Sequence, residues 1–295
     1  KAVNALSSHF FVEAYRDGMS SYAEFREGKL IDSGQRPSKE KNGTFVKFIP
    51  DENLFVGYTF RMEFIESMMK NYSYLKKGLT LNFNGTPYKS ENGLLDLIND
   101  NMSETPLYQP IHIIGEDVEI VMTHGNSYGE NIASFVNGQN TRDGGTHLAA
   151  MREAVSKTLK EFYKTFAKKD FAPEDIRQGI IGAISIQIQE PNFEGQTKTK
   201  LGSNYMWETV TENEDGTHSY EQGPTIRSYV NEFVKTTLDN YLHMHKEIIP
   251  VLQEKIASSE QERKEISTIQ KKTKERNKRT SVYNKKLRDC KYHYK

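Results

Sequence analysis

Three things are scarce or absent in this 295-residue sequence: cysteine, an excess of one charge, and long apolar runs. The single cysteine, Cys290, cannot form a disulfide within the chain and fits a reducing compartment. The 40 Lys and Arg residues balance 40 Asp and Glu residues, so the total charge does not indicate nucleic-acid binding. No apolar run approaches the ~20 residues of a membrane span, and no signal peptide opens the sequence. We therefore expect a soluble, cytoplasmic protein without a membrane partner.

Charge is concentrated near the C-terminus. Residues 271–288 contain nine Lys or Arg residues and one acidic residue, Glu275. Positive charge alone is sufficient for contact with duplex phosphates. A solvated basic helix is the alternative. The candidate DNA phosphate contacts are Lys271, Lys272, Lys274, Arg276, Lys278 and Arg279.

Local patterns in the first hundred residues predict a mixed sheet and a helix. We expect strands at 9–16 and 21–27 joined around Asp17-Gly18, a polar loop at 28–42, and a strand at 44–49 closed by Pro50. Apolar spacing predicts an amphipathic helix at 60–72. A short strand at 79–83 ends in the turn pair Asn84-Gly85.

Beyond a polar stretch at 101–109, two strands, 118–124 and 131–137, are predicted to run antiparallel around a glycine-rich turn. The run Thr141-Arg-Asp-Gly-Gly-Thr-His147 then precedes an amphipathic helix that extends to about Ala167. Thr146 is a candidate helix N-cap, and the glycine pair permits a sharp entry into the helix. A phosphate-binding nest is conceivable at Asp143, Gly144, Gly145 and Thr146, but a structural turn and cap explains every residue without a ligand.

The second half also contains an apolar alternating run with Ile184, Ile186 and Ile188 on one face. Pro191 cannot donate to a strand ladder, so we expect this strand to end there. Residues 203–223 suggest an inserted hairpin or mobile loop. Apolar spacing predicts a helix at 224–249 that breaks near Lys246, followed by a largely solvated helix.

The polar loop from Glu190 to Gly202 follows the predicted strand. It offers the amide of Gln196, the hydroxyl of Thr197, and the ammonium groups of Lys198 and Lys200. A lysine beside short polar neighbours suits a phosphate oxygen. Because loops are often rich in lysine, a solvated surface loop is the alternative.

Two stretches resemble the transducer domain of the ATPase subunit of bacterial type IIA DNA topoisomerases, the gyrase B subunit and its topoisomerase IV counterpart. The first is Asp175-Ile-Arg-Gln-Gly-Ile-Ile-Gly-Ala-Ile-Ser-Ile-Gln-Ile-Gln-Glu-Pro-Asn-Phe-Glu-Gly-Gln-Thr-Lys-Thr-Lys-Leu201. The second is Thr141-Arg-Asp-Gly-Gly-Thr-His147. The resemblance implies an α+β fold. Residues 1–103 would be the C-terminal part of a Bergerat-type (GHKL) ATPase sandwich, and 104–249 a transducer domain resembling domain 2 of ribosomal protein S5. Residues 250–295 would be a long helix and linker towards a Toprim domain.

The resemblance also implies roles for individual residues. In this family the Gln-Thr-Lys loop reaches into the ATP site, so Lys198 would contact the terminal phosphate and Gln196 would bond beside it. Thr44, in Gly43-Thr-Phe-Val-Lys-Phe48, matches a threonine beside the adenine pocket, although it is equally an ordinary strand residue. Val3-Asn-Ala-Leu-Ser7 matches a segment that follows the family's glycine-rich ATP lid, so we expect part of the nucleotide pocket to lie before Lys1.

The function that the resemblance implies is ATP-driven DNA strand passage, in which the transducer couples nucleotide state to closure of a clamp. The cofactor would be ATP with Mg²⁺, whose ligands lie outside this chain. The partners would be DNA, a second copy of the subunit and the DNA-cleaving A-type subunit. His243 and His245 point in different directions from a helix, so we expect no metal site. The alternative is an interaction or chaperone-type module of the GHKL group; gyrase and topoisomerase IV are not distinguished.

Overall fold

The structure, a computed structural model, describes residues 1–212 and 218–280. It has the mixed α and β architecture that the sequence predicts, in two compact units, Lys1–Ile65 and Glu66–Lys295. Within the described ranges, no helix is both long and apolar enough to cross a membrane.

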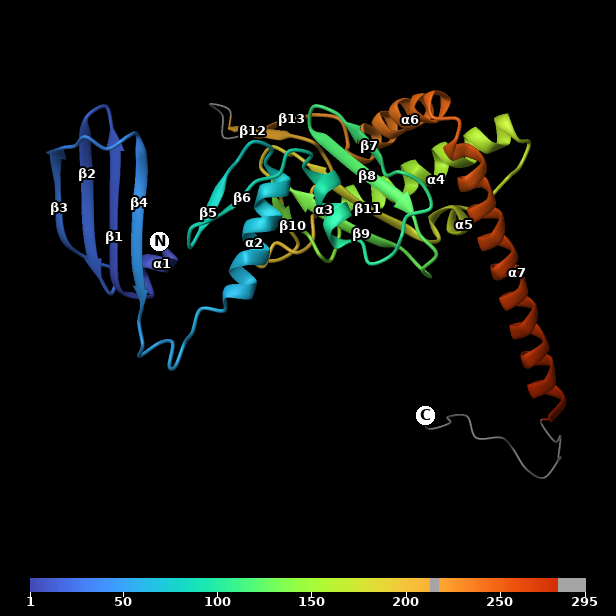
Figure 1. Cartoon of the computed structure of the whole chain (residues 1–295), viewed down its shortest axis with the longest axis horizontal. Helices are drawn as coiled ribbons and strands as arrows, with labels where there is room; N and C mark the ends of the chain where they lie inside the picture. Colours follow the sequence, from blue (N-terminus) through green and yellow to red (C-terminus); the bar gives the residue numbers. More distant parts are fainter. Residues whose placement is uncertain (213–217, 281–295) are drawn as a thin grey trace. The chain divides into compact units, whose positions relative to one another are not determined.

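The first unit is a four-stranded antiparallel sheet with one short helix, α1 (Ala2–Ala5) (Figure 1). Its strands are β1 (Ser7–Arg16), β2 (Met19–Arg26), β3 (Lys29–Pro37) and β4 (Gly43–Pro50), in the order β3-β2-β1-β4. The three predicted strands and the Asp17-Gly18 hairpin are confirmed.

The predicted polar loop at 28–42 is wrong in its first part, because β3 occupies Lys29–Pro37. The reason is a second tight turn at Glu27-Gly28, whose φ values of 49° and 76° match those of Asp17-Gly18, 52° and 82°. Two consecutive residues with positive φ make the hairpin turn that suits the twist of paired strands. The polar strand β3 therefore pairs with β2, although its composition gives little strand signal.

The second unit is built on a five-stranded mixed sheet in the order β10-β9-β11-β8-β7. The strands are β7 (Ile111–Ile114), β8 (Val118–His124), β9 (Asn131–Val136), β10 (Gln139–Asn140) and β11 (Ile180–Ile186). Helices α4 (Thr146–Phe166) and α6 (Ile226–Met244) cover one face. Helix α3 (Leu94–Asn101) and the end of α2 (Met62–Leu75) cover the other.

The predicted pairing of strands 118–124 and 131–137 is wrong, although both strands exist. β11 lies between them, antiparallel to β8 and parallel to β9. β11 has an apolar residue on each face along most of its length, so the central position of the sheet buries more of it than an edge would. The glycine-rich connection at 125–130 therefore spans the width of one strand.

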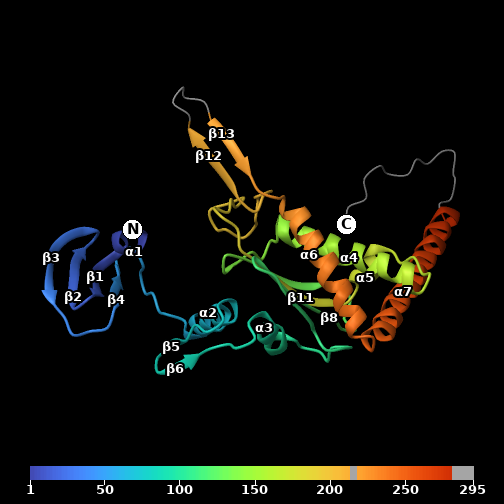
Figure 2. The same cartoon turned by 90° about the horizontal axis from the view of Figure 1, so that it is seen from above.

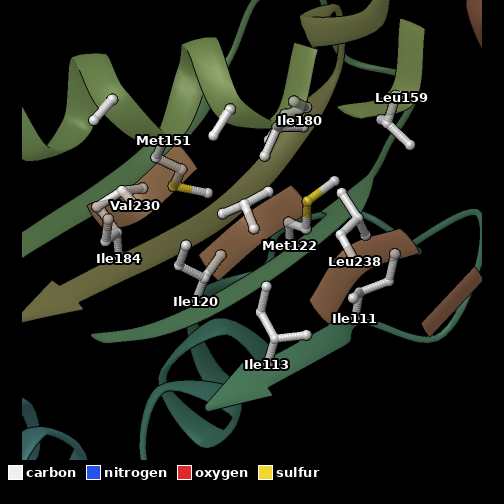
Figure 3. Close-up of a cluster of buried hydrophobic side chains, with 14 of the residues drawn as sticks. Ile111, Ile113, Ile120, Met122, Met151, Leu159, Ile180, Ile184, Val230 and Leu238 are labelled. Atoms are coloured by element: carbon white, nitrogen blue, oxygen red, sulfur yellow. The ribbon is translucent and has the colours of Figure 1, made fainter. Parts of the chain in front are cut away.

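Alternation along the central strands divides the apolar side chains between two clusters. In β11, Ile180, Ile184 and Ile186 face α4 and α6, whereas Ile181 and Ala183 face α3. Figure 3 shows Ile180 and Ile184 gathered with side chains from β7, β8, α4 and α6, all buried. The predicted apolar face of Ile184, Ile186 and Ile188 is confirmed. This core packs both faces of β11, the strand that leads towards the Gln-Thr-Lys loop.

The remaining elements of the second unit, within the described residues, are two hairpins and the helices α5 and α7. The hairpins are β5 (Leu81–Phe83) with β6 (Thr86–Tyr88), turning at Asn84-Gly85 as predicted, and β12 (Glu208–Glu212) with β13 (His218–Gln222). Figure 2 shows the second hairpin standing out from the helical layer, which confirms the hairpin alternative for 203–223. The short α5 (Pro173–Arg177) precedes β11, and α7 (Ile248–Thr280) follows α6.

The break between α6 and α7 falls where the sequence predicts. α6 begins after Thr225, whose hydroxyl accepts a hydrogen bond from the Ser228 amide, a standard N-cap. It ends at Met244, and α7 starts at Ile248 with Pro250 in its first turn, where the missing N–H has no helical acceptor.

Helix α3 belongs to the second compact unit of the chain. α3 packs against β8 and β11 through Leu94, Leu97 and Ile98, and so belongs to the second compact unit. This division at residue 65 rests on contacts within the chain. The predicted domains, 1–103, 104–249 and 250–295, stay predictions.

Candidate functional site

The Gln-Thr-Lys loop is clamped by its main chain to the Asp143–Thr146 turn. Asp143 N donates to Thr199 O at 2.9 Å, and Leu201 N donates to Gly144 O at 3.0 Å. Thr146 N donates to Leu201 O at 3.4 Å. The two stretches that resemble the topoisomerase family, 55 residues apart at Thr146 and Leu201, thus form one site.

A close approach of two backbones explains the glycine pair. A Cβ on Gly145 would lie 2.6 Å from Leu201 N and 2.5 Å from Leu201 O. Gly145 also has φ 137° and ψ −166°, a region that is essentially reserved for glycine. Gly144 has φ 74°. The sharp entry into α4 that the sequence predicts is therefore present.

The N-cap prediction for Thr146 is wrong. Gly145 is the N-cap of α4, Thr146 is the first helical residue, and the cap has no side-chain hydrogen bond. The Thr146 hydroxyl instead donates to Ser203 O at 2.7 Å. The loop competes for this hydroxyl because its far end returns past the start of the helix, an arrangement that local sequence does not reveal.

The base of the loop is also closed on itself. Phe193 and Leu201 form an antiparallel bridge, and Gly202 N donates to Asn192 O at 2.8 Å. Leu201 is 1% exposed and belongs to the main core cluster. The four residues Gly195–Lys198 stay exposed at the tip, so a rigid base presents a solvent-facing tip.

The two lysines of the loop differ in their surroundings. Lys200 Nζ lies 2.8 Å from Glu194 Oε2, an ion pair across the base of the loop. The ammonium of Lys198 lies 5.9 Å from the centroid of the Phe193 ring, and within the described residues no carboxylate stands within ion-pair distance of it. Lys198 also has φ 54°, which turns the backbone at the tip. Lys198 is therefore the lysine available to an incoming anion.

β11 ends at Ile186, five residues before the predicted stop at Pro191. The Asn137 side chain takes over from a neighbouring strand: its Oδ1 accepts from Ile188 N at 2.8 Å and its Nδ2 donates to Ile188 O at 2.7 Å. This side chain satisfies the same main-chain groups that a strand would pair. The Asn137 side chain therefore fixes the main chain between β11 and the loop at Ile188, the last apolar residue of the run.

Beneath the clamp lies a buried polar cluster. Thr141 Oγ1 lies 2.8 Å from Ser134 Oγ and 3.1 Å from His147 Nε2, and all three residues are buried. Burial lowers the pKa of His147 to about 4. The motif's histidine is thus a neutral part of the scaffold under the clamp.

A second buried histidine holds the segment before β11. His124 Nδ1 lies 2.6 Å from the Tyr108 hydroxyl, and its Nε2 lies 2.9 Å from Ile176 O. Since a carbonyl only accepts, Nε2 carries the proton and Nδ1 accepts from Tyr108. Burial lowers the pKa of His124 to about 4.

These two histidines predict a loss of stability in acid. Unfolding returns each pKa from about 4 towards 6.5, so below pH 6.5 the unfolded chain binds more protons and acidification favours unfolding. The stabilisation is complete above pH 6.5 and disappears as the pH falls towards 4. Between pH 7.5 and pH 5, each histidine should lower the free energy of unfolding of the protein by about 2 kcal/mol.

Urea titrations at pH 7.5 and pH 5 measure this loss. We expect His147→Gln to reduce the difference between the two pH values by about 2 kcal/mol. An identical pH dependence in wild type and His147→Gln would contradict the prediction.

The other predicted site residues lie elsewhere. Thr44 is an exposed residue of β4 opposite Ala14 in the first unit, whereas Gln196 and Lys198 belong to the second. Lys271, Lys272 and Lys274 are exposed on α7. Arg276, Lys278 and Arg279 lie on the last turns of that helix. Residues 281–295, which include Cys290 and the last basic residues, are outside the described ranges.

Across residues 1–212 and 218–280, no three His, Cys, Asp or Glu side chains gather to hold a metal ion. The residues that sequence reasoning missed are those of the clamp, above all Leu201 and Ser203. A usable signal is present: Phe193 and Leu201 are apolar residues on either side of a polar run, a spacing that favours a loop with an anchored base.

Comparison with known proteins gives a consistent picture. A family model described as DNA gyrase B matches residues 63–214. The B subunit of DNA topoisomerase 4 from Borreliella burgdorferi is 37% identical over all 295 residues, which is 45% of that protein. The B subunit of DNA gyrase from Thermotoga maritima is 34% identical over 71% of this chain and 37% of that protein. The chain spans less than half the length of these relatives.

Solved structures share the fold. The 43K ATPase domain of Thermus thermophilus gyrase B superposes with a TM-score of 0.67, at 24% identity, over 91% of this chain and 72% of that one. The ATP-binding domain of Francisella tularensis topoisomerase IV gives 0.70, at 21% identity, over 88% of this chain and 71% of that one.

Proposed function

The chain belongs to the DNA gyrase B family, and from this membership we propose that it is part of the ATP-hydrolysing subunit of a type II DNA topoisomerase. The observation that carries the proposal is the clamped loop, in which main-chain bonds to Asp143–Thr146 leave Lys198 exposed at the tip. The sequence match to gyrase and topoisomerase IV subunits supports this function over the interaction or chaperone alternative.

The ligand of the loop is the terminal phosphate of ATP. The residues present fit such a group, because Lys198 is exposed, lacks the acidic neighbour that Lys200 has, and stands beside the exposed amide of Gln196. Lys198 donates a charge-assisted hydrogen bond to a terminal phosphate oxygen, and Gln196 donates beside it. Thr44, in the first unit, is the residue that the resemblance assigns to the adenine. The nucleotide would be bound together with Mg²⁺.

ATP supplies a phosphoryl group whose transfer redistributes charge over its oxygens. Lys198 stabilises that charge better in the transition state than in the ground state, which is what accelerates a reaction. The rigid base of the loop matters because a preorganised donor does not have to be oriented during the reaction. Asp143, Gly144, Gly145 and Thr146 provide this base and have no ligand of their own.

The loop also reports nucleotide state. While the terminal phosphate is present it holds Lys198, and after its release the second unit can move. The movement accompanies closure of a clamp that two copies of the subunit form on a DNA duplex, in a complex with the DNA-cleaving A-type subunit. Lys271, Lys272, Lys274, Arg276, Lys278 and Arg279 contact DNA phosphates along α7.

Protection of Lys198 from an amine-reactive reagent tests the ligand directly. In the full-length subunit, the non-hydrolysable analogue β,γ-imido-ATP should slow the modification of Lys198 about tenfold or more, because a phosphate-bound ammonium is not a free nucleophile. Lys200, which already pairs with Glu194, is the internal control and should keep its rate. Equal rates for Lys198 with and without the analogue would refute the phosphate contact.

A further inference from the structure

An ion pair joins α7 to α5 far from the loop in sequence. Arg263 Nε lies 2.7 Å from Asp175 Oδ1, and Arg263 Nη2 lies 2.7 Å from Asp175 Oδ2. The two parallel hydrogen bonds fix the guanidinium in the plane of the carboxylate. Asp175 is 2% exposed, whereas the Arg263 side chain is 44% exposed. The phosphate chemistry proposed above makes no use of this pair.

Arg263 marks the point where α7 leaves the rest of the unit. Before it, Leu252, Ile256 and Ser259 are buried. After it, Ile266 and Ile269 are 44% and 63% exposed. The hydroxyls of Thr268 and Thr273, further along the helix, donate to carbonyls of α7 itself. Figure 1 shows α7 continuing as one long helix. Within residues 248–275, Arg263 therefore makes the last side-chain hydrogen bonds that join α7 to another element.

Asp175 stands at the other end of the segment that carries the loop. α5 leads through Gly179 into β11, and β11 leads into the clamped loop with Lys198 at its tip. At 3.3 Å per residue, the seven residues of β11 span about 23 Å. His124 holds Ile176 O beside Asp175, and the core cluster holds Ile180 and Ile184. A displacement at the loop therefore reaches Asp175 along a strand packed on both faces.

We propose that the Arg263–Asp175 pair is the latch through which the loop segment, residues 175–201, directs the free part of α7. The proposal rests on the proposed function of Lys198, since that contact is what moves the segment. Arg263 is a positioning residue that touches no nucleotide. It transmits a change in the orientation of α5 to the helix that continues beyond residue 263.

Burial makes the latch a discrete contact. A buried carboxylate without its partner is strongly disfavoured, so Asp175 stays paired unless α7 leaves it altogether. The bidentate geometry also restrains direction, which a single hydrogen bond or a distant charge would not. The guanidinium of Arg263 therefore keeps its orientation relative to α5. When α5 reorients, the free part of α7 reorients with it.

Spin labels measure this transmission in the full-length subunit. Lys157→Cys on α4 and Ile269→Cys on α7, in a Cys290→Ser background, report the distance between the unit and the free part of α7 by double electron–electron resonance. Both labelled positions are exposed. The parent protein should give a narrow distribution that shifts when β,γ-imido-ATP binds.

Arg263→Met keeps an unbranched apolar stem and removes the guanidinium that forms the pair. We expect the nucleotide-free distribution to be about twice as wide, and the response to the analogue to vanish, while the Kd for the analogue changes less than about twofold. Asp175→Asn should do the same, and the double variant should be no worse than either single one, because the two residues act as one contact. Circular dichroism confirms that each variant is folded.

Lys264→Met is the matched control. Lys264 is the next residue of α7 and its ammonium lies 2.7 Å from Glu260 Oε1 of the same helix, so its loss removes an ion pair without detaching α7. It should keep both the narrow distribution and the response.

Three outcomes separate the latch from the function on which it rests. If Arg263→Met and Asp175→Asn keep a narrow distribution that still responds to the analogue, the latch is refuted. A parent distribution that ignores the analogue refutes the coupling itself. Lys198→Ala should lose the response with an unchanged nucleotide-free width, and normal ATP turnover in that variant would count against the proposed function alone.

Discussion

Replacing Lys198 by alanine is expected to lower ATP turnover by the full-length subunit about 10²–10³-fold, or about 3–4 kcal/mol of transition-state stabilisation. The loss should fall mainly on kcat, because the contact strengthens as charge redistributes on the terminal phosphate. Steady-state release of inorganic phosphate over a range of ATP concentrations measures both kcat and KM.

The size of the expected loss follows from the rigidity of the loop base. A donor on a mobile chain would have to be ordered in each cycle, whereas the Gly195–Lys198 tip stands on a base fixed by Leu201 and the Asp143–Thr146 turn. Alanine at position 198 leaves that base intact, so the folded state should keep its stability. Surface substitutions away from special features usually change stability by less than about 0.5 kcal/mol.

Lys200→Ala is the matched control for Lys198→Ala. It removes the same charge two residues away, from a lysine that already neutralises Glu194 at 2.8 Å. We expect a change in turnover of less than about threefold, since an exposed ion pair contributes little. Equal losses for the two variants would mean that the loop acts through its total charge rather than through one directed contact.

How much of the fold the sequence predicts depends on whether a signal is local. The strands at 9–16, 44–49 and 118–124 and the long helices are confirmed, because their apolar periodicity is set within a few residues. The order of the strands is not predicted, since β11 pairs with β8 and β9 through residues 50 to 68 positions away in the sequence. β3 escapes prediction because Leu30 and Ile31 are its only large apolar residues and they do not alternate, so only the Glu27-Gly28 turn indicates it.

The site divides in the same way. The side-chain types of Gln196, Thr197 and Lys198 are sufficient to predict a loop that suits a phosphate. The structure leaves these residues exposed at the tip. The contact between the loop base and the Asp143–Thr146 turn cannot be predicted from the sequence, because any residue type can make its main-chain hydrogen bonds. Thr146 illustrates this: its type and position suit an N-cap, but Ser203 O takes its hydroxyl. The Arg263–Asp175 pair likewise joins residues 88 positions apart, and only the fold brings them together.

Gly145→Ala should break the clamp and destabilise the second unit. The new Cβ would stand 2.5–2.6 Å from main-chain atoms of Leu201, which cannot move aside as a side-chain end could. Alanine would also have to adopt φ 137°, a conformation that costs of order 1–3 kcal/mol by itself. We expect a loss of about 3 kcal/mol or more in the free energy of unfolding, measured by urea titration.

The contact between Leu201 and the Asp143–Thr146 turn should open even in molecules whose second unit stays folded. Relief of the clash separates Gly144–Thr146 from Leu201, so the hydrogen bonds that Leu201 makes to Gly144 and Thr146 are lost together. Exchange of the Leu201 amide hydrogen should therefore accelerate about 10²-fold or more, in proportion to the loss of local stability. Gly195→Ala is the control: the nearest atom to its Cβ would be Thr197 Oγ1 at 3.9 Å. If Gly145→Ala matched Gly195→Ala in both stability and exchange, the close approach of the two backbones would not be what holds the loop.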